Sequence, residues 1–359
     1  MSTRAYLRSL RKGRVLIAVV IVLLAAGAVT GVIVSRGNGK PRASGNTTTT
    51  LPPVLTRCPL TGLPAPGGKA PAREPLAVKI GNEPQARPQS GLNQADIVYD
   101  TPAEGGIQRY VAVFQCDTPS LVGPIRSVRW VDWHILGVFK HAELAFVGGI
   151  APNRTEISSL PYIDDADAFI HYAAYQQNPS RTAPDSTYAS AATLWHLFGY
   201  HPPPKPIFTY STAPLPSRAF PIKSLEINFS EGTDVVWNWD PATGQWIHTY
   251  SGVVDRDALT NQPVTATNIV VQIVHYTLGP FNEDPQPRYG DVESRTVGKG
   301  VGWVLRNGEA IRIFWHCASP TSPTTFTSKT GQPVYLTPGR TWVEIVLNTT
   351  AKSGITLTR

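Results

Sequence analysis

A long apolar run near the amino end restricts how this chain can fold. Twenty residues, from Val15 to Val34, follow one another without a charged side chain. At about 1.5 Å of rise per residue, a helix of this length spans roughly 30 Å, the thickness of the hydrocarbon core of a bilayer. We therefore expect a single transmembrane helix at residues 15–34.

Basic side chains precede this run in a short tail at residues 1–14, and no acidic residue stands among the first 42. The positive-inside rule keeps such an amino end in the cytoplasm and places the rest of the chain outside, as a single-pass protein of the cell membrane. A cleaved signal peptide is the alternative, because the small residues at 25–28 suit a peptidase. The apolar segment of such peptides is typically about 7–15 residues long, however. No cysteine stands near the end of the run, so a lipid-modified cysteine is not expected as the anchor.

The next segment, residues 35–55, is rich in Gly, Ser, Thr, Pro and Asn, which predicts a flexible linker. Beyond it the charges nearly balance. Eight of the 32 Lys and Arg precede residue 43, which leaves 24 against 25 Asp and Glu. A nucleic-acid-binding domain usually carries a basic surface, so we exclude nucleic acid as a partner of the external part.

The segment 56–210 alternates strand and helix patterns. Short β-branched or aromatic runs between Pro, Gly and Asn predict strands at 76–80, 97–99, 107–114 and 144–147. Apolar residues at helical spacing predict helices at 127–141 and 187–198, the second of them capped by Asp185 or Ser186. We expect this segment to form a mixed α/β first domain.

Helical patterns are absent from the segment 211–350. Strands are expected at 234–239, 246–250, 269–274, 302–305, 311–315 and 342–347, with a turn at Asn307-Gly308. Tryptophans recur in these strands, where packing in the core is a better explanation than stacking on sugar rings. The sequence therefore predicts an α+β fold, in which a mainly β second domain follows the first.

Three cysteines lie in the external part, where a disulfide can form. The preferred pair is Cys58 with Cys116, because both belong to the first domain. The alternative is three unpaired thiols. An odd cysteine, Cys317, remains in either case.

Several stretches of the sequence resemble a known family. In the first domain they are CPLTGL at 58–63, ARPQSGLNQADIVY at 86–99, EGGIQR at 104–109 and GPIRSVR at 123–129. In the second they are VGKGVGWVLR at 297–306, Asn307-Gly308 and TPGRTWV at 337–343. Together they resemble the YerB-like bacterial lipoprotein family across nearly all of residues 56–347. The resemblance implies an extracytoplasmic bacterial protein with an α+β first domain and no established activity.

Two features depart from that family. A membrane helix stands where many of its members carry a lipid-modified cysteine. The stretch RTAPDSTY at 181–188 also differs from the usual R-x-x-P-H-N-x-Y, since Asp185 and Ser186 replace the His-Asn pair. Any role of that histidine as a base or ligand is therefore missing from this chain.

Five residues are the candidates for a ligand site: Glu104, Arg109, Arg126, Arg129 and Asp132. Arg126 and Arg129 are expected to share one face at the start of a helix, with Pro124 at its entry. Two guanidinium groups beside free helix N–H groups would bind a carboxylate or a phosphate. The structural alternative is that these arginines pair internally with Glu104, Asp132 or Asp96, since buried arginines need partners.

No metal site and no cofactor are predicted. His134 and His141 are two helical turns apart, about 10 Å along the axis, which is too far to share one ion. Asp164, Asp165 and Asp167 do not continue into an EF-hand loop. Signatures of common hydrolases, nucleotide sites and redox sites are also missing. We expect an envelope module that binds or scaffolds, with an anionic wall polymer or another envelope protein as partner. The alternative is an enzyme acting on envelope glycan or peptide, with Glu104 or Asp132 as acid or base.

Overall fold

The computed structural model describes residues 56–230, 234–282, 290–352 and 354–359. The predicted basic tail, transmembrane helix and linker all lie outside these residues. Within the described ranges, no helix has the length and the apolar composition needed to span a membrane.

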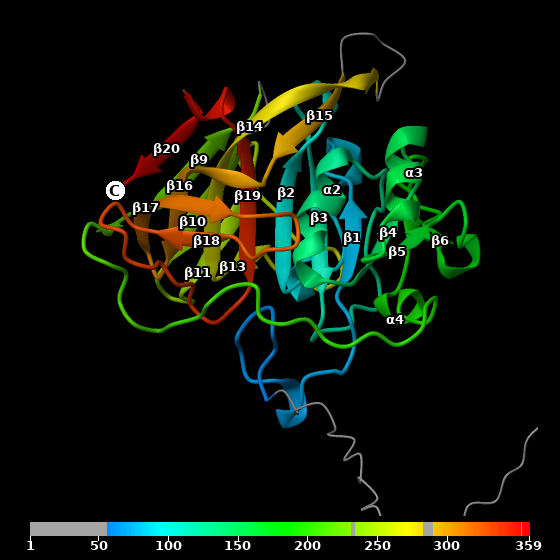
Figure 1. Ribbon diagram of the computed structural model, residues 1–359, viewed down its shortest axis with the longest axis horizontal. Coiled ribbons are helices and arrows are strands. Elements are labelled where there is room, and N and C mark those ends of the chain that lie inside the picture. Colours follow the sequence, from blue (N-terminus) through cyan, green and yellow to red (C-terminus); the bar gives the residue numbers. More distant parts are fainter. Residues whose placement is uncertain (1–55, 231–233, 283–289, 353) are drawn as a thin grey trace, which may run out of the picture. The chain divides into compact units, whose positions relative to one another are not determined.

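A large mixed sheet organises the structure (Figure 1). Its strands run in the order β18-β17-β16-β14-β19-β2-β3-β1-β4-β5, with β15 beside β14 and β8 beside β17. The strands that come early in the chain are β1 (Leu76–Ile80), β2 (Ile97–Pro102), β3 (Gln108–Phe114), β4 (Ala142–Phe146) and β5 (Ile163–Asp167). The later ones are β8 (Phe220–Pro221), β14 (Asn268–Asn282), β15 (Gly290–Arg295), β16 (Gly298–Arg306), β17 (Glu309–Cys317), β18 (Thr325–Thr327) and β19 (Thr341–Leu347).

Strand β19 joins the two halves of this sheet. It pairs in parallel with β14 on one side and with β2 on the other, so that Glu344 lies opposite Asp100. Strands from residues 76–167 and from residues 220–347 therefore share one hydrogen-bonded sheet.

A smaller antiparallel sheet packs on one face of the large one. It consists of β9 (Ser224–Asn228), β10 (Asp234–Asp240), β11 (Gln245–Tyr250), β12 (Val253–Val254), β13 (Thr265–Ala266) and β20 (Ile355–Thr358). Trp237 of β10 meets Trp342 of β19 at a ring-centroid distance of 5.0 Å, and both rings are buried. These tryptophans therefore belong to the core between the two sheets.

The helices are short. They are α2 (Trp130–Leu136), α3 (Ala151–Ser159) and α4 (Ala191–Leu194), and a two-stranded ribbon of β6 (Gln176–Gln177) and β7 (Thr187–Tyr188) precedes α4. All ten predicted strands overlap strands of the structure, which is a mixed α/β fold with mostly strands. The prediction of a helix over 187–198 was too long, because residues 187–188 form β7 and only α4 is helical. Ser190 caps a single turn there by accepting a hydrogen bond from the Thr193 N–H.

The prediction that Arg126 and Arg129 share a helix was wrong. The segment before α2 is extended, because the N–H groups of Ile125 and Arg126 bond to the carbonyls of Thr187 and Lys79. Arg129 is the residue before the first helical one, and its N–H donates to Asp132 Oδ2 at 2.8 Å. These N–H groups are therefore not available to an anion.

A disulfide joins Cys58 to Cys116, with the two Cα atoms 5.9 Å apart. It fastens the first described segment of the chain to the end of β3. Cys317 is a buried free thiol at the end of β17.

Candidate functional site

The structure brings the five predicted site residues into one cluster. Arg109 comes from β3, Glu104 from the turn before it, and Arg126, Arg129 and Asp132 from the approach to α2 and its first turn. Glu83, Asp185 and Lys79 complete this group, which we call the arginine cluster.

The arginine cluster contains four basic and four acidic side chains, and each of them forms an ion pair with another member. Arg109 contacts Glu83 at 3.1 Å and Glu104 at 3.4 Å. Arg126 contacts Glu83 at 3.1 Å and Asp185, and the Arg129 Nε donates to Glu104 Oε2 at 2.6 Å. Asp185, which stands where the resemblance expects histidine, is therefore a partner of Arg126.

Glu104 and Glu83 do not have the raised pKa of a general acid. Burial acts to raise the pKa of Glu104, but Arg129 and Arg109 outweigh it and hold the pKa at about 2. The pKa of Glu83 is lowered in the same way by Arg109 and Arg126. Asp132 pairs with Lys79 at 2.7 Å, and both side chains are fully buried. Arg109 and Arg129 pair with Glu104, as the internal-pairing alternative expects. Arg126 pairs instead with Glu83 and Asp185, which that alternative does not name.

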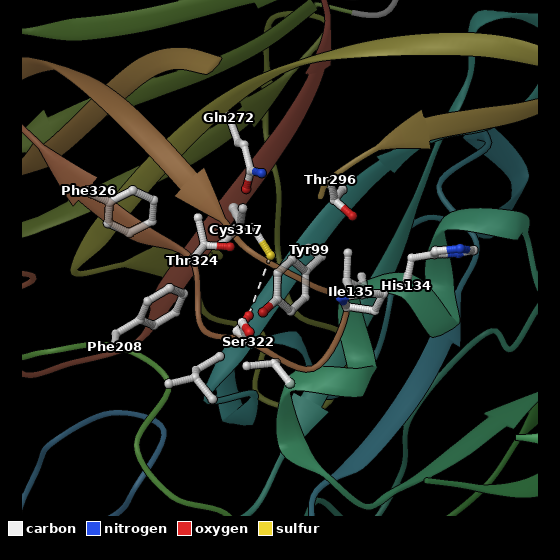
Figure 2. Close-up of a pocket in the computed structure, with 14 residues that line it drawn as sticks. Tyr99, His134, Ile135, Phe208, Gln272, Thr296, Cys317, Ser322, Thr324 and Phe326 are labelled. Atoms are coloured by element: carbon white, nitrogen blue, oxygen red, sulfur yellow. Dashed lines mark hydrogen bonds between the residues drawn. The ribbon is translucent and has the colours of Figure 1, made fainter. Parts of the chain in front are cut away.

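A small cavity lies between β2, α2 and the end of β17 (Figure 2). Tyr99, Cys317 and Phe326 are among the residues that line it, and the Cys317 thiol donates to the Ser322 carbonyl across it. Its volume is about 40 Å³, enough for a few water molecules but far below that of a ligand pocket.

A cleft of about 610 Å³ opens beside the disulfide. Four segments that are distant in the sequence line it: 58–66, 93–96, 116–117 and 337–340. Gln245, Thr267 and Asn307 add further polar groups. We call it the disulfide cleft. A second hollow of about 770 Å³ adjoins it and shares Cys58 and Pro338.

Asp96 is the titratable group of note in the wall of the disulfide cleft. Its Oδ2 accepts the N–H groups of Gln115 at 2.6 Å and Cys116 at 3.2 Å. Burial nevertheless raises the pKa of Asp96 to about 7, because these hydrogen bonds only partly offset the loss of solvent. A carboxyl group with this pKa can hold or release a proton near neutral pH.

Arg340 and Gln94 shape the floor of the same cleft. Arg340 donates to the carbonyl and the Oδ1 of Asn93 and to the Thr265 hydroxyl, which ties the 337–340 segment to the 93–96 segment. The Gln94 Oε1 is buried and has no hydrogen-bond partner among the described residues. The cleft thus offers amide, hydroxyl and carboxyl groups on a fixed frame.

Comparison with known proteins agrees with this architecture. Two family models, described as "Protein of unknown function (DUF3048) N-terminal domain" and "Protein of unknown function (DUF3048) C-terminal domain", match residues 60–201 and 225–343. The chain belongs to the DUF3048 family. The resemblance inferred from the sequence stretches is therefore confirmed.

A curated relative and a solved structure, both of YerB from Bacillus subtilis, span most of the chain. "Putative lipoprotein YerB" of Bacillus subtilis (strain 168) is 28% identical over 310 residues, which cover 83% of this chain and 88% of the relative. The crystal structure of the YerB protein from Bacillus subtilis aligns with a TM-score of 0.70 at 22% identity, over 84% of this chain and 99% of that chain. The structural likeness shows a shared fold.

The stretches that carry the DUF3048 resemblance are divided between the two sites. EGGIQR and GPIRSVR build the arginine cluster, whereas CPLTGL, the NQAD part of the second stretch and TPGR line the disulfide cleft. The sequence analysis missed the cleft, although it named Asp96 as a partner for the arginines. No spacing rule links residues 96 and 340, and only the β19–β2 pairing brings them together.

Proposed function

We propose that the chain is a non-catalytic binding module of the cell envelope, anchored by residues 15–34, with residues 56–359 outside the cell. The disulfide between Cys58 and Cys116 supports an oxidising compartment. The naming of its relative as a lipoprotein also supports a position at the outer face of a membrane. The disulfide cleft is the binding surface. The observation that best supports this role is that four separate segments of the chain line the cleft.

The size of the disulfide cleft suits a segment of an extended ligand. Its volume of about 610 Å³ lies in the range of ligand sites, about 300–1,000 Å³. A flat interface with a folded protein would need roughly 800 Å² on each partner, without a requirement for a cavity. A chain-like ligand, such as a glycan strand or a peptide of the wall, therefore fits better.

The charges of the cleft disfavour the anionic polymer that the sequence analysis considers. Asp96 and the exposed Asp117 line the cleft, and the guanidinium of Arg340 is already bonded to Asn93 and Thr265. The arginines that were expected to hold an anion are paired with carboxylates instead. Hydroxyl, amide or amine groups on the ligand would complement such a surface.

Cosedimentation with insoluble wall fragments tests this proposal. The full-length chain in detergent is compared with the double variant Leu63→Ala/Gln94→Ala. Leu63 is 41% exposed in the cleft and Gln94 has no side-chain hydrogen bond among the described residues, so the fold should tolerate both changes. We expect binding to fall about tenfold, corresponding to roughly 1.4 kcal/mol.

Two further variants complete the comparison. Val253→Ala removes an apolar side chain that is 69% exposed on β12, away from the cleft, and should bind like the wild type. Arg126→Ala should also bind normally, although it weakens the fold. Equal binding by all variants would contradict the proposal that the disulfide cleft binds the ligand. A loss of binding only in Arg126→Ala would indicate that the ligand binds at the arginine cluster.

The position outside the cell has its own test. A reporter enzyme that is active only outside the cytoplasm, fused after Arg359, should be active in intact cells. A cytoplasmic reporter fused at the same place should be inactive. Activity of only the cytoplasmic reporter would contradict a role in the cell envelope.

One observation favours an enzyme as the second candidate. The pKa of Asp96, raised to about 7 by burial, suits a general acid or base at neutral pH. Wild-type protein would then release soluble fragments from wall preparations, and Asp96→Asn would not, since an amide side chain cannot act as an acid or a base near neutral pH. If the wild-type protein binds the wall preparation but releases no soluble fragments, the enzyme candidate is ruled out and the binding module is retained.

A further inference from the structure

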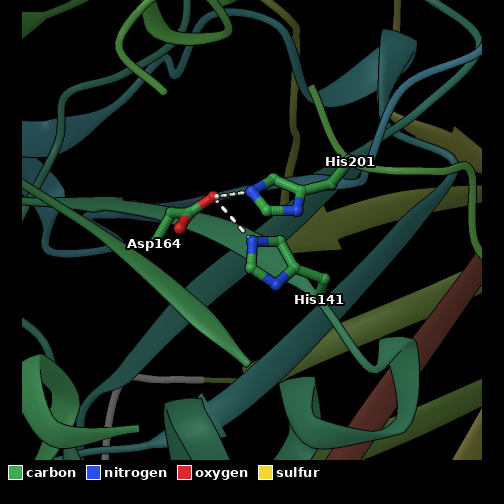
Figure 3. A group of neighbouring side chains, drawn as sticks. All are labelled: His141, Asp164 and His201. Carbon is green, nitrogen blue, oxygen red and sulfur yellow. Dashed lines mark hydrogen bonds and ion pairs between the residues drawn. The ribbon is translucent and has the colours of Figure 1, made fainter. Parts of the chain in front are cut away.

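Two histidines and an aspartate converge on one point at the edge of the large sheet (Figure 3). His141 immediately precedes β4, Asp164 lies in β5, and His201 follows α4. The His141 Nε2 is 2.8 Å from Asp164 Oδ2, and the His201 Nε2 is 3.3 Å from the same oxygen. We call these three residues the histidine pair site.

We propose that the histidine pair site binds a divalent transition-metal ion, with zinc as the best match. Two imidazole nitrogens and a carboxylate oxygen form a ligand set that zinc uses in proteins. Tetrahedral zinc, with bonds of about 2.0–2.2 Å, holds its ligand atoms roughly 3.3 Å apart. The His201 Nε2 lies at that distance from Asp164 Oδ2, and the His141 Nε2, at 2.8 Å, would have to move outward slightly.

A buried carboxyl group that has neither a hydrogen-bond donor nor a cation in the described structure lies beside the site and supplies an independent reason for a metal ion. Glu143 lies in register with Asp164 on the neighbouring parallel strand, so the two side chains emerge on the same face of the sheet. Glu143 is fully buried, and neither of its carboxylate oxygens has a hydrogen-bond partner among the described residues. Such a group costs folding free energy unless a donor or a cation approaches it.

Glu74 adds a third carboxylate. Its Oε2 accepts the N–H of His201 at 3.2 Å, which ties the His201 loop to the start of β1. In the described part of the chain, no lysine or arginine forms an ion pair with Glu74, Glu143 or Asp164. A divalent ion would provide the positive charge that these three acidic side chains otherwise lack.

The site is accessible enough to load. The side chains of His141, Asp164 and His201 are 20%, 17% and 32% exposed. The two imidazole rings stack with their centroids 3.4 Å apart, whereas tetrahedral coordination would separate the centroids to about 5 Å. Metal binding therefore requires the His201 ring to swing away from His141 while both Nε2 atoms stay directed at Asp164.

Spacing in the sequence gives no indication of this site. His141 and His201 are separated by β4, α3, β5, the β6–β7 ribbon and α4. The three aspartates of β5 do not act together either: Asp165 accepts the Ser158 hydroxyl, and Asp167 accepts the Gly148 N–H and pairs with Arg154. Only Asp164 faces the two histidines.

Zinc titration of tag-free, full-length protein against a chromogenic chelator tests the proposal. We expect one zinc ion per chain for the wild type. His141→Ala, His201→Ala and the isosteric Asp164→Asn should each weaken binding by about 100-fold or more. Glu143→Gln, which replaces a neighbouring carboxyl group with an amide of the same shape, should weaken it by about tenfold. His196→Ala, an exposed histidine five residues before His201, is the matched control and should bind zinc normally.

Thermal melting separates a lost ligand from a lost fold. Zinc should raise the melting temperature of the wild type and of His196→Ala, because an ion that binds only the folded state stabilises it. Asp164→Asn should melt without zinc near the metal-free wild type and gain nothing from zinc. No zinc stabilisation of the wild type, or equal zinc affinity in the wild type and the three ligand variants, would overturn the proposal.

Discussion

The Lys79 ammonium lies 2.7 Å from Asp132 Oδ1 with both side chains fully buried, and it also donates to the Thr101 hydroxyl. This pair anchors the start of α2 to β1, because the second carboxylate oxygen of Asp132 holds the Arg129 N–H. It gives the arginine cluster a rigid base.

Breaking this pair should be costly. Lys79→Met leaves a buried carboxylate without its cation, so we expect the free energy of unfolding to drop by about 3–5 kcal/mol. Lys79→Met/Asp132→Leu removes both charges and should recover most of that loss. Urea denaturation of the single and double variants measures both values. A double variant that is less stable than the single one would show that the charges themselves stabilise the fold.

Glu104 should make stability fall in acid. Its pKa is about 2 in the folded protein, held down by Arg129 and Arg109 against the effect of burial, and the ordinary value is 4.5. The stabilisation is therefore complete above about pH 4.5 and disappears as the pH falls toward 2, with a total of about 3 kcal/mol. Glu104→Gln should lack this part of the acid dependence in denaturation curves between pH 5 and 2. An unchanged acid dependence would show that Glu104 isn't held by its arginines.

Asp100 and Glu344 should make stability fall as the pH rises, the opposite of the effect of Glu104. Burial raises the pKa of both carboxyls, that of Glu344 to about 7, and repulsion from Glu344 adds to the rise at Asp100. The folded state then keeps protons that the unfolded chain has lost, so stability falls as the pH rises from about 4 through 7. Asp100→Asn should flatten this decline between pH 5 and 8, whereas Asp240→Asn, at the end of β10, should not. Parallel curves for Asp100→Asn and the wild type would refute the assignment.

The disulfide should support both the fold and the disulfide cleft. Cys58 and Cys116 are 58 residues apart, and opening a loop of this length should lower the free energy of unfolding by about 4 kcal/mol. Cys58→Ser/Cys116→Ser should therefore denature at lower urea concentration and bind wall fragments less well. In the control variant Cys317→Ser, reductant should lower the stability as much as it does in the wild type. Stability that doesn't respond to reductant would mean that the bond contributes nothing.

Half of the strands in the described residues can be predicted from the sequence, since alternating β-branched and aromatic runs ended by Gly, Pro or Asn are local signals. The hairpin at Asn307-Gly308 is an example, where both residues adopt positive φ, 53° and 75°. Helices were harder to place. Residues 187–198 carry a helical apolar pattern, yet Thr187–Tyr188 pairs with β6 instead, so a tertiary contact overrides the local preference.

The candidate sites show the same division. The arginine cluster was predictable because its arginines and Glu104 lie in recognisable stretches, but its pairing was not, because Glu83 and Asp185 are 20 or more residues from the groups they neutralise. The disulfide cleft depends on β19 lying beside β2, and the histidine pair site on β5 lying beside β4. Contacts of this kind have no signature in a single sequence.

Hydrogen–deuterium exchange of the full-length chain, with and without purified wall fragments, tests the proposed binding surface most directly. We expect the fragments to slow exchange of the amides at 58–63, 93–96 and 337–340, which line the disulfide cleft, and to leave residues 104–129 unchanged apart from the cleft-lining 116–117. Slower exchange only at 104–115 and 118–129, or no change anywhere, would contradict the account.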